Sequence, residues 1–396
     1  MRIAFITFEY PPRLWGGAGV YAENLVTSLA RLGHELQVYV PTPGGRSVVE
    51  DRAPGVVVNR IGSSLDRLPG FLPFCLRVTK RLERAKGGEM PDVVHVNSIG
   101  FFAFRDRVKG PAYVSTGHHL SAETVRKVRP RIVDRILDFR GESGHLSSMM
   151  ERSGARFPDR FIAVSQETKR SLRSIYHVPE RLVDVVWNGV DPRGAPAGPQ
   201  DREALRARLG LPPGPMILFV GRVDDPRKDL LTLVRAMALV QREQRASLVA
   251  VGGGLSTRAE RLAKELGVHD RLFFRGRVSP EDLWSTYLVA DAYVCASLQE
   301  GFGITILESL CAGCKVISTE VGVASELRDR IETVVPSASP EPMARAITDA
   351  LASPGRSGLA EVRVPPEFTW ERSAKQTLAV YEKALETRRG RGSEKG

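Results

Sequence analysis

Two glutamates, Glu300 and Glu308, flank a glycine-containing turn and are the side chains in this chain best suited to hold a sugar. Carboxylates accept hydrogen bonds from hydroxyl groups and can do so with both oxygens. The segment between them begins Gly301, Phe302, Gly303, Ile304. Glycines have no Cβ, so the backbone can turn sharply here and approach a ligand closely.

The elements around this turn determine where the two carboxylates lie. An apolar run at 292–295 predicts a buried strand before the turn, and apolar residues from Ile304 onward recur at helical spacing. In a strand–loop–helix unit, the free N–H groups and the dipole at the helix start favour an anion. The pattern therefore predicts a site for a sugar joined to a phosphate. An ordinary strand-to-helix connection with solvated glutamates is the alternative.

Two cations occupy comparable positions earlier in the chain. Arg222 follows an apolar run at 215–220, and Lys228 lies near the start of the next predicted helix. A cation at a helix start opposes the dipole, so this placement is favourable when an anion binds between the lysine and the backbone N–H groups. Two ordinary surface cations are the alternative.

The Glu300–Glu308 element, E-x7-E with G-F-G inside it and Ala312-Gly313 after it, resembles the signature of family 4 glycosyltransferases. These are retaining enzymes of the GT-B fold. The resemblance implies two Rossmann-like, doubly wound parallel-sheet domains facing a cleft. In it, Arg222 and Lys228 match a pair that neutralises the donor diphosphate, while Glu300 orients sugar hydroxyls and Glu308 the ribose hydroxyls.

The resemblance also assigns residues in the first half of the chain. A predicted strand at 2–8 precedes the glycine-rich loop of Gly16 and Gly17, which is not a G-x-G-x-x-G dinucleotide fingerprint. A histidine is expected at the end of the strand at 113–116, close to the transferred sugar. His118 is favoured for that role, although His119 stands where the family usually has an acidic residue, so the choice between them stays open.

The site residues implied by the resemblance fall into two sets. The catalytic set is Glu300, His118, Arg222 and Lys228. The donor-binding set is Gly16, Gly17, Arg222, Lys228, Arg277, Val278, Glu300, Gly301, Phe302, Gly303, Ile304 and Glu308. Arg277 and Val278 are expected at the edge of the nucleotide base. No metal ligand and no cofactor is expected, because a Lys/Arg pair can replace a metal and the nucleotide diphosphate sugar is a substrate.

Apolar runs alternate with helical patterns along most of the chain, which predicts parallel, doubly wound sheets. We expect an N-terminal acceptor-binding domain at 1–190 and a C-terminal nucleotide-sugar-binding domain at 191–368. A Pro-, Gly- and Ala-rich linker at 191–200 joins them. In GT-B proteins a terminal helix crosses back to the first domain, here expected at 369–388. A disordered tail is expected at 389–396.

Composition narrows the alternatives further. The chain has 396 residues, 42% hydrophobic, with a net charge of +11 and no apolar run of the ~20 residues that span a bilayer. We therefore expect a cytoplasmic protein. Four cysteines form no disulfide framework. The basic stretch at 121–156 is compatible with peripheral contact with an anionic membrane at its inner face, and a solvated helix face is the alternative.

Together these features predict a retaining hexosyltransferase that moves a sugar from a nucleotide diphosphate donor to an acceptor hydroxyl on a glycan or lipid-linked substrate. A sugar-nucleotide epimerase on the GT-B frame, which needs no acceptor, is one alternative. A nucleotide-sugar-binding protein without catalysis is another. The positive charge also fits an RNA-binding module, but no helix-turn-helix, RNP or finger pattern supports that reading, and no nucleic-acid partner is expected.

Overall fold

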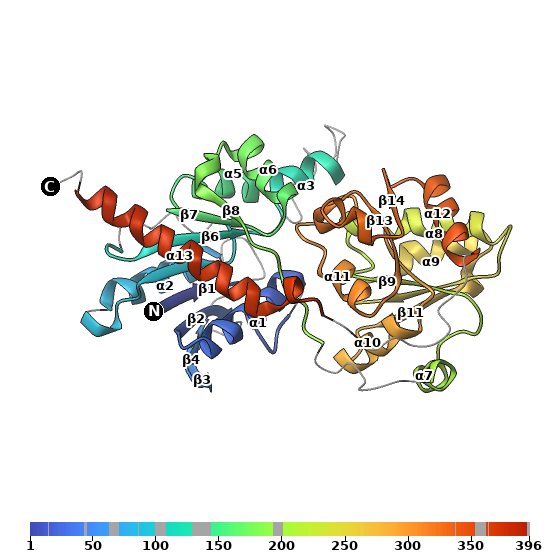
Figure 1. Cartoon of the computed structure of the whole chain (residues 1–396), viewed down its shortest axis with the longest axis horizontal. Helices are drawn as coiled ribbons and strands as arrows, with labels where there is room; N and C mark the ends of the chain where they lie inside the picture. Colours follow the sequence, from blue (N-terminus) through green and yellow to red (C-terminus); the bar gives the residue numbers. More distant parts are fainter. Residues whose placement is uncertain are drawn as a thin grey trace. The chain divides into compact units, whose positions relative to one another are not determined.

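The computed structural model describes residues 1–393 except 15, 43–45, 63–70, 86, 100–107, 129–143, 193–200, 337, 353–361 and 363. The chain divides into two compact units (Figure 1). Unit 1 comprises residues 1–189 and 367–396, and unit 2 comprises residues 190–366. Residues 193–200 of the expected linker lie outside the described residues. Residues 129–143 of the basic stretch at 121–156 also lie outside them.

Within the described residues, unit 1 contains an eight-stranded sheet in the order β3-β4-β2-β1-β5-β6-β7-β8. Its strands are β1 (Arg2–Ile6), β2 (Glu35–Thr42), β3 (Val48–Ala53), β4 (Val56–Gly62), β5 (Val93–Val96), β6 (Ala112–Gly117), β7 (Arg160–Ala163) and β8 (Val183–Val185). All neighbouring pairs are parallel except β3 and β4. The strand order reverses between β1 and β5, and open parallel sheets bind ligands at such a switch point.

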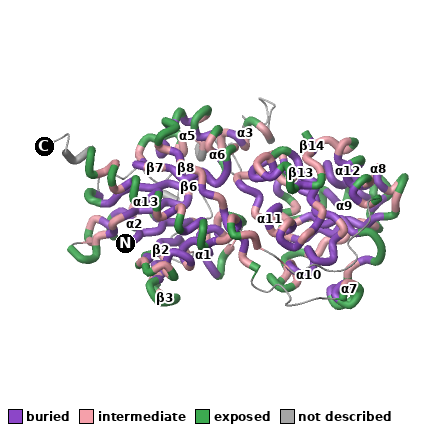
Figure 2. The backbone as a smooth tube through the Cα atoms, viewed as in Figure 1, coloured by how far each residue is buried: buried purple, intermediate pink, exposed green. Residues whose placement is uncertain are grey.

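The central strands of this sheet are short apolar runs because both of their faces are covered. Every residue of β5 and β6 is buried, and only Arg2 of β1 is partly exposed. Such continuous burial is typical of parallel strands with helices on both faces. The tube in Figure 2 shows this buried layer as purple segments in both units. The apolar runs expected at 2–8 and 113–116 are therefore strands with slightly different ends.

Helices connect and cover the strands of unit 1. They are α1 (Gly17–Arg31), α2 (Phe71–Arg84), α3 (Ser121–Val128), α5 (Gly144–Gly154), α6 (Gln166–Tyr176) and α13 (Trp370–Ser393). Helix α1 ends before Gly33, whose φ of +84° suits a residue that terminates a helix. Ser165 caps α6, because its Oγ accepts a hydrogen bond from Thr168 N at 3.1 Å.

The terminal helix α13 belongs to unit 1, where it packs on α1, β6 and β7. The expected disordered tail at 389–396 is wrong for residues 389–393, because α13 continues to Ser393. Arginine is a good helix former, and cations near a helix C-terminus interact favourably with its dipole. Two glycines in this last stretch cost only about 1 kcal/mol each relative to alanine, which the helix tolerates.

Unit 2 contains, within the described residues, a six-stranded parallel sheet in the order β11-β10-β9-β12-β13-β14. Its strands are β9 (Met216–Val220), β10 (Ser247–Val251), β11 (Leu272–Gly276), β12 (Ala292–Cys295), β13 (Lys315–Thr319) and β14 (Thr333–Val335). Its helices are α7 (Arg202–Leu209), α8 (Leu230–Val240), α9 (Thr257–Glu265), α10 (Pro280–Val289), α11 (Ile304–Cys311) and α12 (Pro340–Ala352). Counted within the unit, the strand order is 3-2-1-4-5-6, the Rossmann order, with its switch point between β9 and β12.

Two strands were not expected from the sequence. β3 pairs antiparallel with β4, and five of its six residues are exposed, so it carries no apolar run. β14 has only three residues at the sheet edge. A strand whose pairing comes from tertiary context has a weak sequence signal.

Gly189 is the last residue of the first segment of unit 1 and meets the start of α13. A Cβ at this position would lie 2.4 Å from Trp370 N, closer than real Cβ contacts occur. A glycine is therefore needed at position 189 for packing, because only a residue without a side chain lets the two backbones approach this closely.

Candidate functional site

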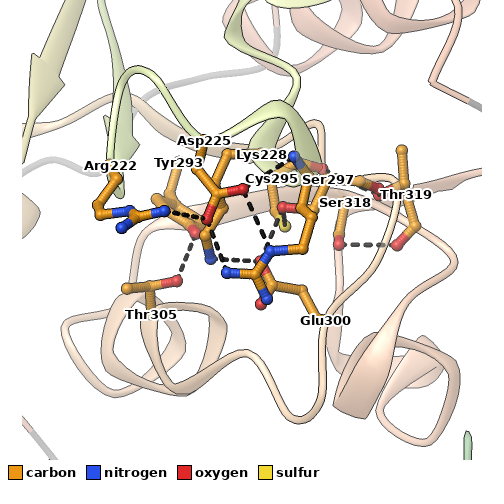
Figure 3. A network of polar contacts seen from close by, with 11 residues as sticks. Arg222, Asp225, Lys228, Tyr293, Cys295, Ser297, Glu300, Thr305, Ser318 and Thr319 are labelled. Carbon is orange, nitrogen blue, oxygen red and sulfur yellow. Dashed lines mark hydrogen bonds and ion pairs between the residues drawn. The ribbon is translucent and has the colours of Figure 1, made fainter. Parts of the chain in front are cut away.

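The predicted donor residues of unit 2 follow the two strands that flank its switch point. Arg222 and Lys228 come after β9, and Glu300 comes after β12. The carboxyl ends of neighbouring parallel strands meet at one edge of the sheet, so these side chains converge although 72 residues separate Lys228 from Glu300. Figure 3 shows the resulting network of polar contacts.

A short ion pair joins Lys228 to Glu300. Lys228 Nζ lies 2.6 Å from Glu300 Oε1, and the two side chains are 20% and 11% exposed. Ser297 Oγ donates a second hydrogen bond to the same Oε1 at 2.7 Å. Burial disfavours the charged lysine, but the carboxylate of Glu300 outweighs that cost and raises the pKa of Lys228. Within the described residues, Glu300 Oε2 has no hydrogen-bond partner, so this oxygen can accept from a ligand hydroxyl.

Arg222 is held by an acidic residue that it shares with a second arginine. Its Nη2 lies 3.3 Å from Oδ2 of the buried Asp225, while Arg227 contacts both oxygens of that carboxylate, at 3.1 and 2.7 Å. Burial raises the pKa of Asp225, but the hydrogen bonds and charge of Arg227 outweigh it and lower the pKa to about 2. Arg222 itself is 44% exposed, so it is positioned but still open to solvent.

The turn between Glu300 and α11 has the close-packed geometry that its glycines predict. Gly303 adopts a φ of +90° and is the N-cap residue of α11. Phe302 O accepts a hydrogen bond from Val323 N at 2.7 Å, and a Cβ on Gly322 would lie 2.3 Å from the same oxygen. The loop after β13 therefore packs directly against this turn. Ile306 N donates to Gly303 O at 2.9 Å, whereas the N–H groups of Ile304 and Thr305 have no acceptor within the described residues and are available to an anion.

Glu308 lies on α11, and Tyr287 of α10 donates a hydrogen bond from its hydroxyl to Glu308 Oε2 at 2.9 Å. Burial raises the pKa of Glu308 to about 7, although the Tyr287 hydrogen bond acts in the opposite direction. An unfavourably desolvated carboxylate at neutral pH is a candidate for ligand binding, because a hydroxyl donor would stabilise its charged form.

Arg277 and Val278 follow β11 at the same edge of the sheet. The loops there are tightly packed, since Gly252 N donates to Gly276 O at 2.8 Å and a Cβ on Gly252 would lie 1.9 Å from Gly221 O. A Cβ on Gly253 would lie 2.9 Å from Arg277 Nε, so the arginine side chain lies over this backbone. Arg277 is exposed and Val278 half-buried.

The remaining predicted site residues belong to unit 1. Gly16 is the N-cap residue of α1, and its N–H donates to Glu9 Oε2 at 2.9 Å. Gly17 begins α1, and both Gly16 and Gly17 are exposed. The side chain of Glu9 also fills the space beside Gly19, where a Cβ would lie 2.8 Å from its Oε2. Glu9 thus shapes the glycine-rich loop, a role that the sequence did not indicate.

The two histidines after β6 have different environments. His118 is half-buried, its ring packs edge-to-face on Tyr21 at 4.8 Å between centroids, and its Nε2 lies 2.6 Å from Asn97 Oδ1. Burial lowers the pKa of His118 to about 3, and the neighbouring His119 contributes to the shift. His119 is exposed. His118 is thus the histidine that the fold holds in one orientation.

The structure therefore brings Arg222, Lys228, Glu300 and the start of α11 together in unit 2, with Glu308 one helical turn further on. Gly16, Gly17 and His118 lie in unit 1. Sequence reasoning missed the residues that orient these groups: Asn97, Asp225, Arg227, Tyr287 and Ser297. Asp225 lies three residues after Arg222, and Ser297 lies three residues before Glu300. This closeness to predicted site residues in strand-end loops was the feature of the sequence that could have indicated them.

Two family descriptions match consecutive parts of the chain. "Glycosyltransferase Family 4" matches residues 15–193, and "Glycosyl transferases group 1" matches residues 201–361. A D-inositol 3-phosphate glycosyltransferase of Nocardia farcinica is 31% identical over 93% of this chain and 85% of its own. No helix in the described part of the chain has the length and hydropathy needed to cross a membrane.

Solved structures with the same architecture cover the whole chain. Sucrose-phosphate synthase from Thermosynechococcus elongatus aligns with a TM-score of 0.72 at 21% identity, over 100% of this chain and 98% of its own. Alr3699/HepE of Anabaena, solved in complex with UDP and glucose, aligns with a TM-score of 0.64 at 17% identity, over 100% and 99%. These likenesses, with the two parallel sheets, confirm the expected GT-B fold class of two Rossmann-like domains.

Proposed function

Because the chain belongs to the family 4 type of glycosyltransferases, we propose that it transfers a hexosyl group from a nucleotide diphosphate sugar to an acceptor hydroxyl, with retention of anomeric configuration. The observation that carries the proposal is the Lys228–Glu300 pair at the switch point of unit 2, with Arg222 and the start of α11 beside it. Cations, helix N–H groups and a hydroxyl acceptor stand together where open parallel sheets bind nucleotides.

In this proposal, Arg222, Lys228 and the first N–H groups of α11 bind the diphosphate. Departure of the nucleotide diphosphate increases its negative charge, and fixed cations and N–H dipoles stabilise that charge without reorganising. The Asp225 contact keeps Arg222 in place, while its partial exposure leaves donors available. Two cations and a helix terminus can do the work of a divalent metal, so we propose that donor binding is metal-independent and that no cofactor is needed.

The two glutamates have separate roles. Glu300 accepts from a hydroxyl of the transferred sugar through Oε2, since Lys228 and Ser297 already occupy Oε1. Glu308 accepts from the ribose hydroxyls, which would stabilise the charge that burial now disfavours. Arg277 and Val278 lie at the base edge. From unit 1, Gly16 and Gly17 contact the donor through their backbone, and His118 binds a sugar hydroxyl.

Retention follows from a same-face displacement. The bond between the anomeric carbon and the leaving phosphate oxygen breaks, the acceptor oxygen bonds to that carbon on the same face, and the acceptor proton passes to the departing diphosphate. Glu300 is a poor candidate for a nucleophile that would invert the centre twice, because its carboxylate is ion-paired to Lys228 and hydrogen-bonded to Ser297.

We further propose a glycan or lipid-linked acceptor and peripheral contact with an anionic membrane. Helix α2 supports this, because it buries Phe74, Val78 and Leu82 and exposes a cationic face. That face consists of Arg77, Lys80, Arg81 and Arg84, none of which forms an ion pair within the described residues. Co-sedimentation with vesicles containing anionic lipid, lost at high salt and in an alanine variant of this face, tests the contact.

The proposed function is tested by NMR of the anomeric protons during turnover. The donor is incubated with the protein alone and then with candidate acceptors, including D-inositol 3-phosphate, the compound in the name of the relative from Nocardia farcinica. A product glycoside with the donor's anomeric configuration supports the proposal. An inverted product would contradict retention, and conversion of the donor without any acceptor would indicate the epimerase alternative.

A further inference from the structure

Asn97 lies directly after β5, at the switch point of unit 1, and contacts His118 after β6. The residue is 5% exposed, and its backbone N–H donates to Ile6 O at 2.8 Å, which fixes Asn97 to the end of β1. A buried amide at a ligand-binding sheet edge can fix the orientation and the protonated nitrogen of a histidine to which it is hydrogen-bonded.

The hydrogen bonds of Asn97 determine which end of its amide faces His118. Asn97 Nδ2 lies 3.0 Å from Ala18 O, and a backbone carbonyl can only accept. The same nitrogen lies 3.1 Å from Thr7 Oγ1, whose own hydrogen goes to Glu9 O at 3.0 Å. Both amide hydrogens are therefore used, and the amide cannot be flipped without opposing two acceptors. Oδ1 faces His118 as an acceptor.

That orientation determines the tautomer of the histidine. His118 Nε2 lies 2.6 Å from Asn97 Oδ1, so Nε2 must carry the hydrogen. Burial and the neighbouring His119 hold the pKa of His118 far below its ordinary value, so the ring is neutral at pH 7. Its Nδ1 then carries a lone pair and, within the described residues, has no hydrogen-bond partner.

We propose that Asn97 is a positioning residue that holds His118 in the Nε2–H tautomer, so that the Nδ1 lone pair is offered to a substrate hydroxyl. The half-buried ring leaves this atom within reach of a ligand. The identity of the hydroxyl rests on the proposed function, whereas the tautomer does not. The groups around the ring are His119, the ring of Tyr21, the hydroxyl of Thr168 on the His118 carbonyl, and His95.

The test is ¹⁵N NMR of selectively labelled histidine rings between pH 6 and 8, with the His118 signals identified by their loss in His118→Gln. In the parent protein, Nε2 should show the shift of a protonated nitrogen and Nδ1 that of an unprotonated one. Asn97→Ala should give a tautomer mixture and lower kcat/KM roughly 10- to 100-fold, by analogy with the loss of a partner that orients a metal-ligating histidine. Asn97→Asp keeps an acceptor but adds a charge, so it should raise the His118 pKa and make turnover fall as pH is lowered.

A parent protein with Nδ1 protonated, or with two tautomers in equal amounts, overturns the assignment, and this measurement needs no variant to fold. Parental kcat/KM in a folded Asn97→Ala protein overturns the positioning role. The expected tautomer in a protein that transfers no sugar would leave the assignment standing and reject the proposed function instead, so the two failures are distinguishable.

Discussion

Replacing Lys228 with alanine removes its ion pair with Glu300, and the effects on stability and on catalysis can be measured separately. The substitution leaves Glu300, whose side chain is 11% exposed, with Ser297 as its remaining donor. Breaking a buried ion pair costs about 3–5 kcal/mol. Because this pair is partly exposed and one donor remains, we expect a loss of about 2–3 kcal/mol, or a fall in Tm of roughly 4–12 °C for a unit of this size.

The same substitution should lower the rate of sugar transfer by at least ~100-fold, as loss of a central charge stabiliser does. Both quantities are measured at a temperature where the variant is fully folded, by calorimetry and by a coupled assay of nucleotide release with donor and acceptor present. The double variant Lys228→Met/Glu300→Gln removes both charges, so it should regain most of the lost stability but no activity.

The matched control is Lys375→Ala. Lys375 also pairs with a carboxylate, that of Glu371, but the two side chains are 61% and 66% exposed on α13. Exposed pairs of this kind contribute little because solvent screens their charges, so stability and activity should both stay near parental values. Activity of Lys228→Ala within a few-fold of the parent would refute the phosphate role. A double variant no more stable than Lys228→Ala would show that the unpaired carboxylate of Glu300 is not the cause of the lost stability.

Three further predictions follow from individual contacts. Burial raises the pKa of Glu308 to about 7, so its contribution to stability is fully present below its unfolded pKa of ~4.5 and is lost as pH rises to 7 and above. The Tm of Glu308→Gln should therefore rise relative to that of the parent between pH 5 and 8. A Tm difference that stays constant over this range would contradict the raised pKa. Ser165→Ala removes the cap of α6 and should cost about 1 kcal/mol in denaturant unfolding, with an unchanged midpoint arguing against the cap. Gly189→Ala forces a Cβ against Trp370 N and should cost about 1–3 kcal/mol, whereas Gly390→Ala, with open space around it, should not destabilise.

The alternation of apolar runs with helical patterns was enough to predict two parallel sheets, because strands buried on both faces leave a strong signal. The run at 292–295 is a strand in the structure with the same ends. The strand β3 gave no such signal, since its pairing with β4 is antiparallel and its residues face solvent. Helix α13 extends beyond the expected residue 388 to Ser393. Its last residues are polar and include glycines, which predicted disorder, but the arginines among them favour a helix.

The candidate site divides along a similar line. Residues in strand-end loops, such as Arg222, Lys228 and Glu300, could be named because their types and positions already suit a phosphate and a sugar. Their mutual contacts could not be named, because a 2.6 Å pair across 72 residues depends on which strands become neighbours. The orienting residues Asn97 and Tyr287 could not be found for the same reason, since each acts through a contact made only in the folded sheet.

Thermal stabilisation by nucleotides tests the proposed metal-independent nucleotide diphosphate site in unit 2. UDP, GDP, ADP and TDP are each added with and without EDTA to the parent and to Lys228→Ala. A ligand at ~100 times its dissociation constant adds about 2.7 kcal/mol, which is an easily measured shift. We expect at least one nucleotide to stabilise the parent equally well with and without EDTA and to stabilise Lys228→Ala much less. Stabilisation by no nucleotide, or stabilisation that EDTA abolishes, would contradict it.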